Sequence, residues 1–318
     1  MCREQSRKWE VHVGVCDRRH PCRPGIVDCL QWESDMRLID RLLLVATLSV
    51  GLISTTRAED GVIPLDVTGP RPTAEFVVGT HPPVNVIFDT GAGGTVLLPA
   101  YAAKLALPNQ GSVGVGSPAG GAPRQGYLTT LPSARLGQAL ITNARAVVVD
   151  LGLPLEGISG VVSPNVFAGS LLRFELKKSR AVVVPKSPGT LPQADALPYG
   201  GGGHPLPSAM IDVAGVKVEA HIDTGNGRGL ALPLELAKRL SLKTPLAPGK
   251  EVRMVSSTHR SFTATIAGAV KIGPLTLIDP DVTFVEGVPI ANVGFSVLKD
   301  LTIVLDPAER RTWLLPSE

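Results

Sequence analysis

The chain has 318 residues, of which 44% are hydrophobic and 19% charged, so it can bury a sizeable core and is neither an intrinsically disordered nor a fibrous protein. Only 4% of the residues are aromatic, whereas 34 are glycine and 28 are proline, which favours many short strands and turns over a helix bundle or a coiled coil. The formal net charge of +3, without any run of like charge, excludes nucleic acid as the default partner.

The beginning of the chain has the pattern of a leader. All four cysteines lie within residues 1–35, a polar, arginine-rich segment without helical or strand periodicity, and their spacing fits no zinc site. Residues 36–58 then give a methionine, a basic start, an uncharged apolar run and a cleavage site with small residues before Glu59, which is the order of a secretory signal peptide. We therefore expect residues 1–35 to be a non-native extension, Met36 to be the true start, and the mature protein to be periplasmic or secreted.

The apolar run of this leader, residues 42–56, is shorter than the roughly 18 residues that a membrane-spanning helix needs. A cleaved signal is therefore favoured over a retained signal anchor, and no cysteine follows the run to carry a lipid. Without cysteines, the mature chain has to hold itself together by packing alone, which its length allows.

The remaining sequence contains an internal repeat. Residues 87–91 are Ile-Phe-Asp-Thr-Gly, and residues 221–225 are His-Ile-Asp-Thr-Gly. The offset between these motifs also separates two later glycines, Gly160 and Gly294, which lie in apolar stretches and precede a strand–turn–strand pattern. Because several features keep one offset, we interpret the sequence as two homologous lobes.

The lobes are expected over residues 59–187 and 208–318, joined by a proline- and glycine-rich linker over residues 188–207. Both lobes are expected to be predominantly β. Since one chain carries both copies of the motif, a monomer is sufficient.

Each Asp-Thr-Gly follows an apolar strand, so Asp89 and Asp223 are expected at the ends of buried strands. An isolated ionised carboxylate is costly to bury. Two such loops, related by pseudo-two-fold symmetry, can face each other and share one proton, so that one carboxylate activates water as a base while the other acts as an acid. Thr90 and Thr224 can lock the loops together by hydrogen bonds, and the glycines allow the close approach.

These motifs resemble those of the aspartic proteases of the pepsin and retropepsin group, specifically a bacterial, exported, retropepsin-like member with both halves in one chain. The resemblance rests on residues 88–92, on residues 222–225 and on the apolar–apolar–glycine elements at Gly160 and Gly294, and it covers about residues 63–315. It implies an all-β fold of two homologous pepsin-like β-barrel lobes with a cleft between them. In such a fold the apolar–apolar–glycine elements pass beside the catalytic loops.

The resemblance also implies a chemistry. An aspartic endopeptidase hydrolyses peptide bonds with a water molecule activated between two Asp carboxylates, so the partner would be a peptide or protein substrate. No metal ion or organic cofactor is needed, because the nucleophile is water. The catalytic residues would be Asp89 and Asp223, and the supporting loop residues would be Thr90, Gly91, Thr224 and Gly225.

By the same resemblance, each lobe should carry a β-hairpin flap over the cleft. In the first lobe, the glycine-rich residues 111–127 are the candidate flap, with Tyr127 as its substrate-binding aromatic residue. In the second lobe, residues 254–265 take this place, with Phe262 as the corresponding aromatic residue.

The chain departs from the pepsin pattern directly after each Asp-Thr-Gly. Single-chain pepsins usually have a Ser or Thr there, whose hydroxyl group contacts the outer carboxylate oxygen, whereas this chain has Ala92 and Asn226. Alanine at this place is of the retroviral type, and asparagine fits neither pattern. The nearby Arg228 has two interpretations, a cation that lowers the pKa of the carboxylates or binds an acidic substrate group, and a solvated loop residue.

Two alternative functions stay open. The glycine-rich segment at the first motif also resembles the phosphate loops of actin-like sugar kinases, although the export signal, the short chain and the lack of long helical segments count against an ATP-binding kinase. The fold could also serve as a catalytically inactive binding module in the periplasm.

Overall fold

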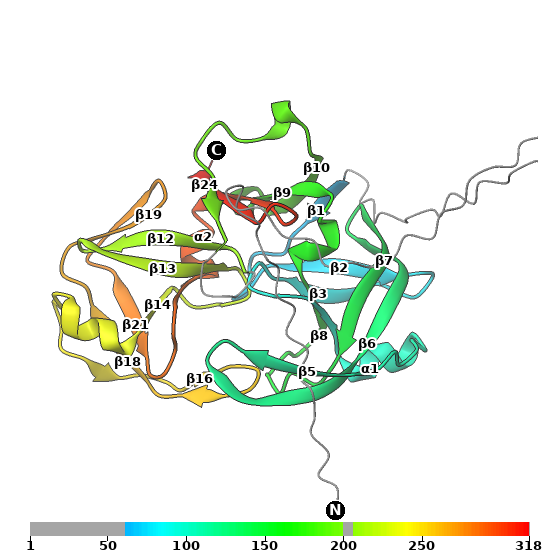
Figure 1. Cartoon of the computed structure of the whole chain (residues 1–318), viewed down its shortest axis with the longest axis horizontal. Coiled ribbons are helices and arrows are strands. Elements are labelled where there is room, and N and C mark those ends of the chain that lie inside the picture. Colours follow the sequence, from blue (N-terminus) through cyan, green and yellow to red (C-terminus); the bar gives the residue numbers. More distant parts are fainter. Residues whose placement is uncertain (1–60, 200–205, 318) are drawn as a thin grey trace, which may run out of the picture. The chain divides into compact units, whose positions relative to one another are not determined.

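β-Strands make up most of the regular structure in the computed structural model, which describes residues 61–199 and 206–317. The predicted extension, residues 1–35, and the predicted signal peptide, residues 36–58, lie outside the described residues. Among the described residues, none of the helices has the length and hydrophobicity to cross a membrane. The strands form three larger sheets, of which two belong to one lobe each and the third is shared (Figure 1).

Seven strands form the sheet of the first lobe. The order across the sheet is β2 (Thr73–Val78), β3 (Val84–Phe88), β8 (Ile158–Val162), β4 (Thr95–Leu97), β7 (Ala139–Val148), β6 (Gly120–Leu136) and β5 (Ser112–Ser117). The end of β6 also pairs with β2, Leu136 opposite Phe76, so the sheet curls back on itself.

Nine strands form the sheet of the second lobe. Their order is β20 (Leu275–Ile278), β19 (Ala269–Ile272), β12 (Ser208–Val213), β13 (Val216–Asp223), β22 (Ala291–Gly294), β14 (Leu230–Pro233), β21 (Asp281–Val285), β18 (Ser261–Thr265) and β15 (Ala247–Pro248). A separate hairpin consists of β16 (Val252–Arg253) and β17 (Thr258–His259).

The two lobe sheets repeat one topology. Across the sheets, the order β2-β3-β8-β4-β7-β6-β5 of the first lobe corresponds to the order β12-β13-β22-β14-β21-β18-β15 of the second lobe. In the second lobe, the separate strands β19 and β20 take the places of the end of β6 and the beginning of β7. In both lobes the strand that leads to the Asp-Thr-Gly motif, β3 or β13, runs parallel to the apolar–apolar–glycine strand, β8 or β22. The next strand, β4 or β14, is antiparallel to that glycine strand. The predicted all-β fold of two homologous lobes is confirmed.

The third sheet contains strands from both lobes. Its centre is the antiparallel pair of β9 and β23, one from each repeat, and the described residues belong to one compact unit. The order across the sheet is β1 (Gly61–Pro64), β10 (Arg180–Pro185), β9 (Ser170–Glu175), β23 (Leu301–Asp306), β24 (Arg311–Pro316) and β11 (Leu197–Pro198).

Part of the predicted linker, residues 188–207, belongs to this shared sheet. Residues 188–190 form a 3-10 helix, and Leu197–Pro198 form β11, which pairs with Thr312 and Arg311 of β24. β11 occupies one edge of the sheet and β1 the other. Proline lacks a backbone N–H group and is tolerated at a sheet edge, which is why a proline-rich segment can contribute a strand here.

The helices are short. The α-helices are α1 (Pro99–Lys104) and α2 (Phe295–Leu298), and further 3-10 turns cover Pro164–Phe167, Leu176–Lys178 and Leu234–Arg239. Proline opens α1 at a position where a missing N–H group costs no helical hydrogen bond.

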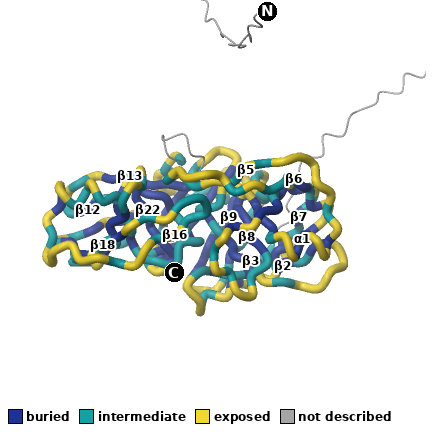
Figure 2. Tube along the Cα trace, turned by 90° about the horizontal axis from the view of Figure 1, so that it is seen from below, coloured by how far each residue is buried: buried dark blue, intermediate teal, exposed yellow. Residues whose placement is uncertain are grey.

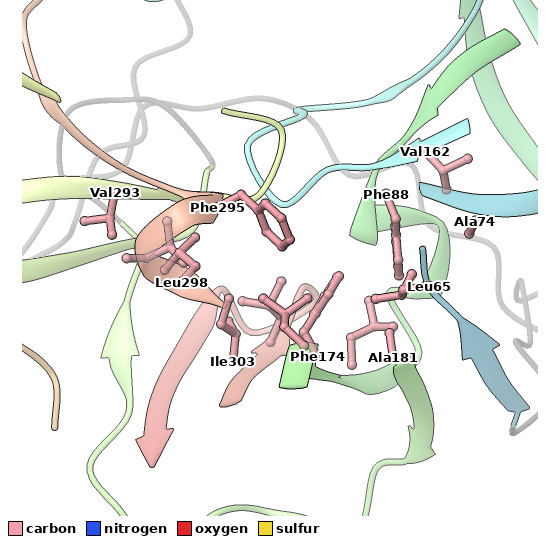
Figure 3. Packing of buried hydrophobic residues seen from close by; sticks show 14 of the residues in the cluster. Leu65, Ala74, Phe88, Val162, Phe174, Ala181, Val293, Phe295, Leu298 and Ile303 are labelled. Carbon is pink, nitrogen blue, oxygen red and sulfur yellow. The ribbon is translucent and has the colours of Figure 1, made fainter. Parts of the chain in front are cut away.

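The main core extends through both lobes and the shared sheet. Figure 2 shows buried residues along β3, β8, β9 and β22, whereas β5 alternates between exposed and half-buried residues. In Figure 3, Phe88 of β3, Phe174 of β9 and Phe295 of α2 belong to one cluster, and the rings of Phe88 and Phe174 are 4.7 Å apart. Because Phe88 directly precedes Asp89, this packing fixes the point at which the loop of the first Asp-Thr-Gly motif begins.

Candidate active site

Asp89 and Asp223 lie at the ends of two buried strands, and their side chains lie close together. Asp89 follows the last residue of β3 and donates its backbone N–H to the carbonyl of Val162 at the end of β8 (3.0 Å). Asp223 ends β13 and lies opposite Gly294 in the parallel pairing with β22. As predicted, the apolar–apolar–glycine strands pass beside both loops. A side chain at Gly294 would collide with the backbone of the loop after Asp223, so glycine is required there.

The threonines of the two motifs hold the loops together through four reciprocal hydrogen bonds. The backbone N–H of Thr90 donates to Thr224 Oγ1 and that of Thr224 donates to Thr90 Oγ1, both at 3.0 Å. Each hydroxyl group then donates to the opposite strand, Thr90 to the carbonyl of Ile222 (2.6 Å) and Thr224 to that of Phe88 (2.9 Å). Both side chains are fully buried, so each polar atom is paired as burial requires.

The glycines of the motifs allow the carboxyl groups to approach each other. A Cβ atom on Gly91 would lie 2.5 Å from the carboxyl carbon of Asp223, and one on Gly225 would collide with the carboxyl group of Asp89. The backbone N–H groups of Gly91 and Gly225 both donate to Asp89 Oδ1, at 2.7 and 3.1 Å. Each glycine therefore lies against the aspartate of the opposite lobe.

The two carboxyl groups interact directly, and the pKa of Asp89 is raised well above its ordinary value. The main cause is burial, because surrounding protein atoms displace water from the carboxyl group, followed by the negative charge of Asp223. A hydrogen bond between the two carboxyl groups raises the pKa further, and the N–H groups of Gly91 and Gly225 only partly oppose the shift. Two adjacent carboxyl groups in this state can hold one proton between them, which supplies a base and an acid at the same time.

Asn292 contacts the dyad, and the sequence analysis missed it. Its Nδ2 atom donates to Asp223 Oδ2 at 2.6 Å, and its Oδ1 atom accepts a hydrogen bond from Nδ2 of Asn226 at 2.7 Å. The backbone N–H of Asn226 donates to Asp223 Oδ1 at 3.0 Å. The available signal was the asparagine at an apolar position of the apolar–apolar–glycine element. Asn292 thus supplies a side-chain donor to Asp223, although no Ser or Thr directly follows the second Asp-Thr-Gly.

Arg228 belongs to the loop after Asp223, and its guanidinium group donates to the carbonyl oxygen of Glu251 at 3.2 Å. Arg228 is not among the causes of the raised pKa of Asp89. The geometry therefore favours a loop contact over a cation that adjusts the dyad.

Both predicted flap regions contain a hairpin, and the hairpin tips meet. In the first lobe, β5 and β6 turn at residues 117–120, and in the second lobe β16 and β17 turn at residues 254–257 (Figure 1). The backbone N–H of Ser117 donates to Ser256 Oγ at 2.9 Å, and Nε of Arg124 donates to the carbonyl of Val255 at 2.6 Å. These contacts link the two lobes a second time, far from the threonines in sequence.

The two predicted flap aromatics do not lie at these tips. Tyr127 is in β6, opposite Ser112 at the base of the hairpin, and it packs against the main core. Phe262 is in β18, opposite Phe284 of β21, outside the β16–β17 hairpin, and it also packs against the core. The assignment of Phe262 to the flap is therefore corrected. The large apolar rings are stabilised by burial in the lobes rather than by exposed turns.

A second apolar cluster joins the strand before Asp89 to both hairpins. It is built on Ile87 of β3 and Val161 of β8, and Val115 of β5 and Val255 of the β16–β17 turn pack against it. The members of this cluster are aliphatic.

Two cavities lie at equivalent places on the two lobes, away from both aspartates. One, of about 230 Å³, is lined by residues that include Val84 and Tyr101, and the other, of about 340 Å³, by residues that include Val218 and Glu235. Among the described residues, no group of three or more His, Cys, Asp or Glu side chains is arranged to hold a metal ion.

Comparison with known families supports the aspartic protease assignment for the first lobe. Residues 74–162 match the aspartyl protease family. The matched segment runs from β2 to the end of β8 and contains Asp89, Thr90 and Gly91. No curated protein matches the chain. The second lobe repeats the topology of the matched segment, and the fold as a whole is that of a two-lobed, pepsin-like aspartic protease.

Proposed function

We propose that the protein is an aspartic endopeptidase with Asp89 and Asp223 as its catalytic residues. The observation that carries this proposal is the position of two carboxyl groups, one from each lobe, which contact each other across reciprocal threonine hydrogen bonds. The family match of the first lobe agrees with it. Thr90, Gly91, Thr224 and Gly225 support the two loops.

In the proposed reaction, the ionised carboxylate takes a proton from a water molecule while the protonated carboxyl group gives its proton to the carbonyl oxygen of the substrate. The water oxygen forms a bond to the carbonyl carbon and gives a tetrahedral intermediate. The carbon–nitrogen bond then breaks as the leaving amine takes a proton from one carboxyl group of the dyad. At the same time a hydroxyl group of the intermediate gives its proton to the other, ionised carboxylate, which yields the carboxylic acid product. The dyad ends with one proton, as it began.

An extended substrate would lie between the catalytic loops and the flaps. Main-chain hydrogen bonds to the flap strands would align it, as in other cases where a peptide adds to a sheet edge. Val115 and Val255 would offer it apolar contacts. The hydrogen bonds between the flap tips would have to open to admit the peptide, and a single chain supplies every part of the site.

Two alternatives remain relevant to this proposal. The described residues form short helices only, so nothing in them favours an actin-like kinase. A catalytically inactive binding module would share the fold and the dyad, and activity alone separates it from the enzyme.

The test is cleavage of denatured casein and of a peptide library between about pH 3 and 7, the range in which a carboxyl dyad holds one proton. Asp89→Asn and Asp223→Asn should each lower kcat/KM by roughly two to four orders of magnitude, because each removes one of the two proton-transfer groups. Asp195→Asn, at an exposed position, is the matched control and should keep full activity. A wild-type protein that binds peptides but cleaves none would support the inactive binding module instead.

We also propose that the mature protein is exported and begins near Glu59. Support comes from the order of basic, apolar and small residues over residues 36–58. N-terminal sequencing of the protein recovered from the periplasm or medium of a bacterial host should give a start after Ala58. A mature start within residues 1–35 would contradict both the true start at Met36 and the cleaved signal.

A further inference from the structure

We infer that Asn292, oriented by Asn226, is a positioning residue that keeps Asp223 ionised and thereby places the shared proton of the dyad on Asp89. This inference rests on the proposed function for its catalytic meaning, but the location of the proton is a property of the resting protein. It divides the roles that the proposed function leaves open, with Asp223 as the base and Asp89 as the acid.

A chain of hydrogen bonds fixes the direction of both amide groups. The backbone N–H of Arg228 donates to Asn226 Oδ1 (3.0 Å), and a backbone N–H group can only donate. The other end of that amide, Nδ2, must therefore face Asn292, whose Oδ1 accepts at 2.7 Å. Consequently Asn292 presents Nδ2 to Asp223 Oδ2, at 2.6 Å. Neither amide group can be turned over without setting two acceptors or two donors against each other.

The two carboxyl groups receive their hydrogen bonds differently. Both oxygens of Asp223 accept from a donor, Oδ1 from the backbone N–H of Asn226 and Oδ2 from Asn292. Donors on both oxygens favour the ionised form. Asp89 accepts two N–H groups, from Gly91 and Gly225, on Oδ1 alone, so its Oδ2 atom can carry a proton while both hydrogen bonds remain.

This asymmetry arises from two positions at which the repeat differs. By the register of the paired strands, the residues that correspond to Asn226 and Asn292 in the first lobe are Ala92 and Val161. Neither of these has a side-chain donor. Val161 lies opposite Ile87 in the parallel pair of β3 and β8, as Asn292 lies opposite His221, the counterpart of Ile87, in that of β13 and β22. Both loops are thus flanked by a parallel strand, and only the second lobe adds an amide group at this place.

In the described part of the chain, the charged or titratable groups that flank Asp223 include Asp89 on the facing loop, His221 two residues earlier on β13 and Arg228 in the following loop. Lys217 and Glu219 lie further back on β13, and Arg71 follows Pro70, whose carbonyl group packs against the loop at Gly227. The strands β22 and β14 and the helix α2, which pack against the loop, contain no titratable side chain. Asn292 is therefore the side chain that contributes a neutral, directed donor to this carboxylate.

The first test locates the proton in the wild-type protein without using activity. Carbon-13 NMR of protein labelled at the Asp carboxyl carbons, assigned with Asp89→Asn and Asp223→Asn, should show Asp223 ionised at a pH at which Asp89 is still protonated. The reverse order of titration would overturn the inference, whether or not the protein cleaves peptides. This measurement also keeps the two proposals separate, because a protein without protease activity could still show the expected order.

The second test removes the amide groups and measures the pH dependence of kcat/KM. Asn292→Leu has nearly the same shape without the donor, and the double variant Asn226→Ala with Asn292→Val gives the second lobe the residues of the first. In both, the acidic limb of the profile should move up by about one pH unit, because Asp223 loses a hydrogen bond that favours its ionised form. The double variant avoids an unpaired amide group at Asn226 should the single one fail to fold.

Asn165→Ala is the matched control, since its exposed amide group donates to the carbonyl of Gly93 (3.1 Å) and not to a carboxylate. It should leave the acidic limb in place. Active Asn292 variants whose acidic limb coincides with that of the wild type would contradict the inference while leaving the protease proposal intact.

Discussion

At the scale of single residues, the dyad places two acidic groups where water is largely excluded. The raised pKa of Asp89, caused first by burial and then by the charge of Asp223, means that the folded protein holds a proton that the unfolded chain releases at lower pH. The site therefore contains an electrostatic repulsion between two carboxylates whenever both are ionised. Such repulsion is common where carboxyl groups are arranged for acid–base chemistry.

The raised pKa of Asp89 predicts that the stability of the fold depends on pH. Above about pH 4, the ordinary pKa of an unfolded Asp, the folded state binds more protons than the unfolded state until the pH passes the folded pKa, so the free energy of unfolding falls as the pH rises. Asp89→Asn removes this term, and its stability relative to the wild type should therefore increase from pH 4 to pH 7 in urea unfolding. Asp195→Asn, at an exposed position, should show no such trend. A difference between Asp89→Asn and the wild type that does not change with pH would contradict the assigned shift.

At the scale of elements, the two Asp-Thr-Gly loops depend on each other. Each threonine hydroxyl group accepts from the opposite loop and donates to the opposite strand, so neither loop has a complete set of hydrogen bonds alone. The flap hairpins are coupled in the same way through Ser117, Ser256 and Arg124. The lobes are thus joined on both sides of the proposed substrate position.

Replacing one of these threonines should cost stability and activity together. Thr90→Val or Thr224→Val keeps the shape but leaves a buried N–H group of the opposite loop unpaired, which should lower the free energy of unfolding by about 1–3 kcal/mol. Thr129→Val is the matched control, because Thr129 is also buried but its hydroxyl group has no hydrogen-bond partner among the described residues. Chemical unfolding of the three variants measures the difference. Equal losses at all three positions would show that the cross-lobe hydrogen bonds contribute nothing specific.

The dyad could be predicted from the sequence because each half of it lies in a short, contiguous sequence pattern. An apolar strand followed by Asp-Thr-Gly, repeated at a constant offset, was enough to predict which residues the structure brings together. Asn292 could not be found in this way, since its role depends on the register between β13 and β22, which sets residues far apart in sequence side by side. Phe262 was misplaced for a related reason: the β16–β17 turn precedes β18, and composition does not show where one hairpin ends.

At the scale of the whole molecule, the shared sheet turns two repeats into one unit. β9 and β23 pair along four residues each, and the fully buried Asp306 at the end of β23 accepts from Lys186 (2.9 Å) and Arg311 (3.3 Å). β1 and β11 form the two edges, so the proline- and glycine-rich segment between the lobes contributes a strand to the shared sheet. Each lobe supplies one aspartate, so both lobes contribute to the dyad.

The central claim is that this unit is an enzyme whose two carboxyl groups act together, and the pH profile of peptide hydrolysis tests it most directly. The account predicts a bell-shaped dependence of kcat/KM on pH, because only the singly protonated dyad is active, and predicts that Asp89→Asn and Asp223→Asn each lower its maximum by roughly two to four orders of magnitude. Peptide hydrolysis that persists undiminished in both variants would contradict the account.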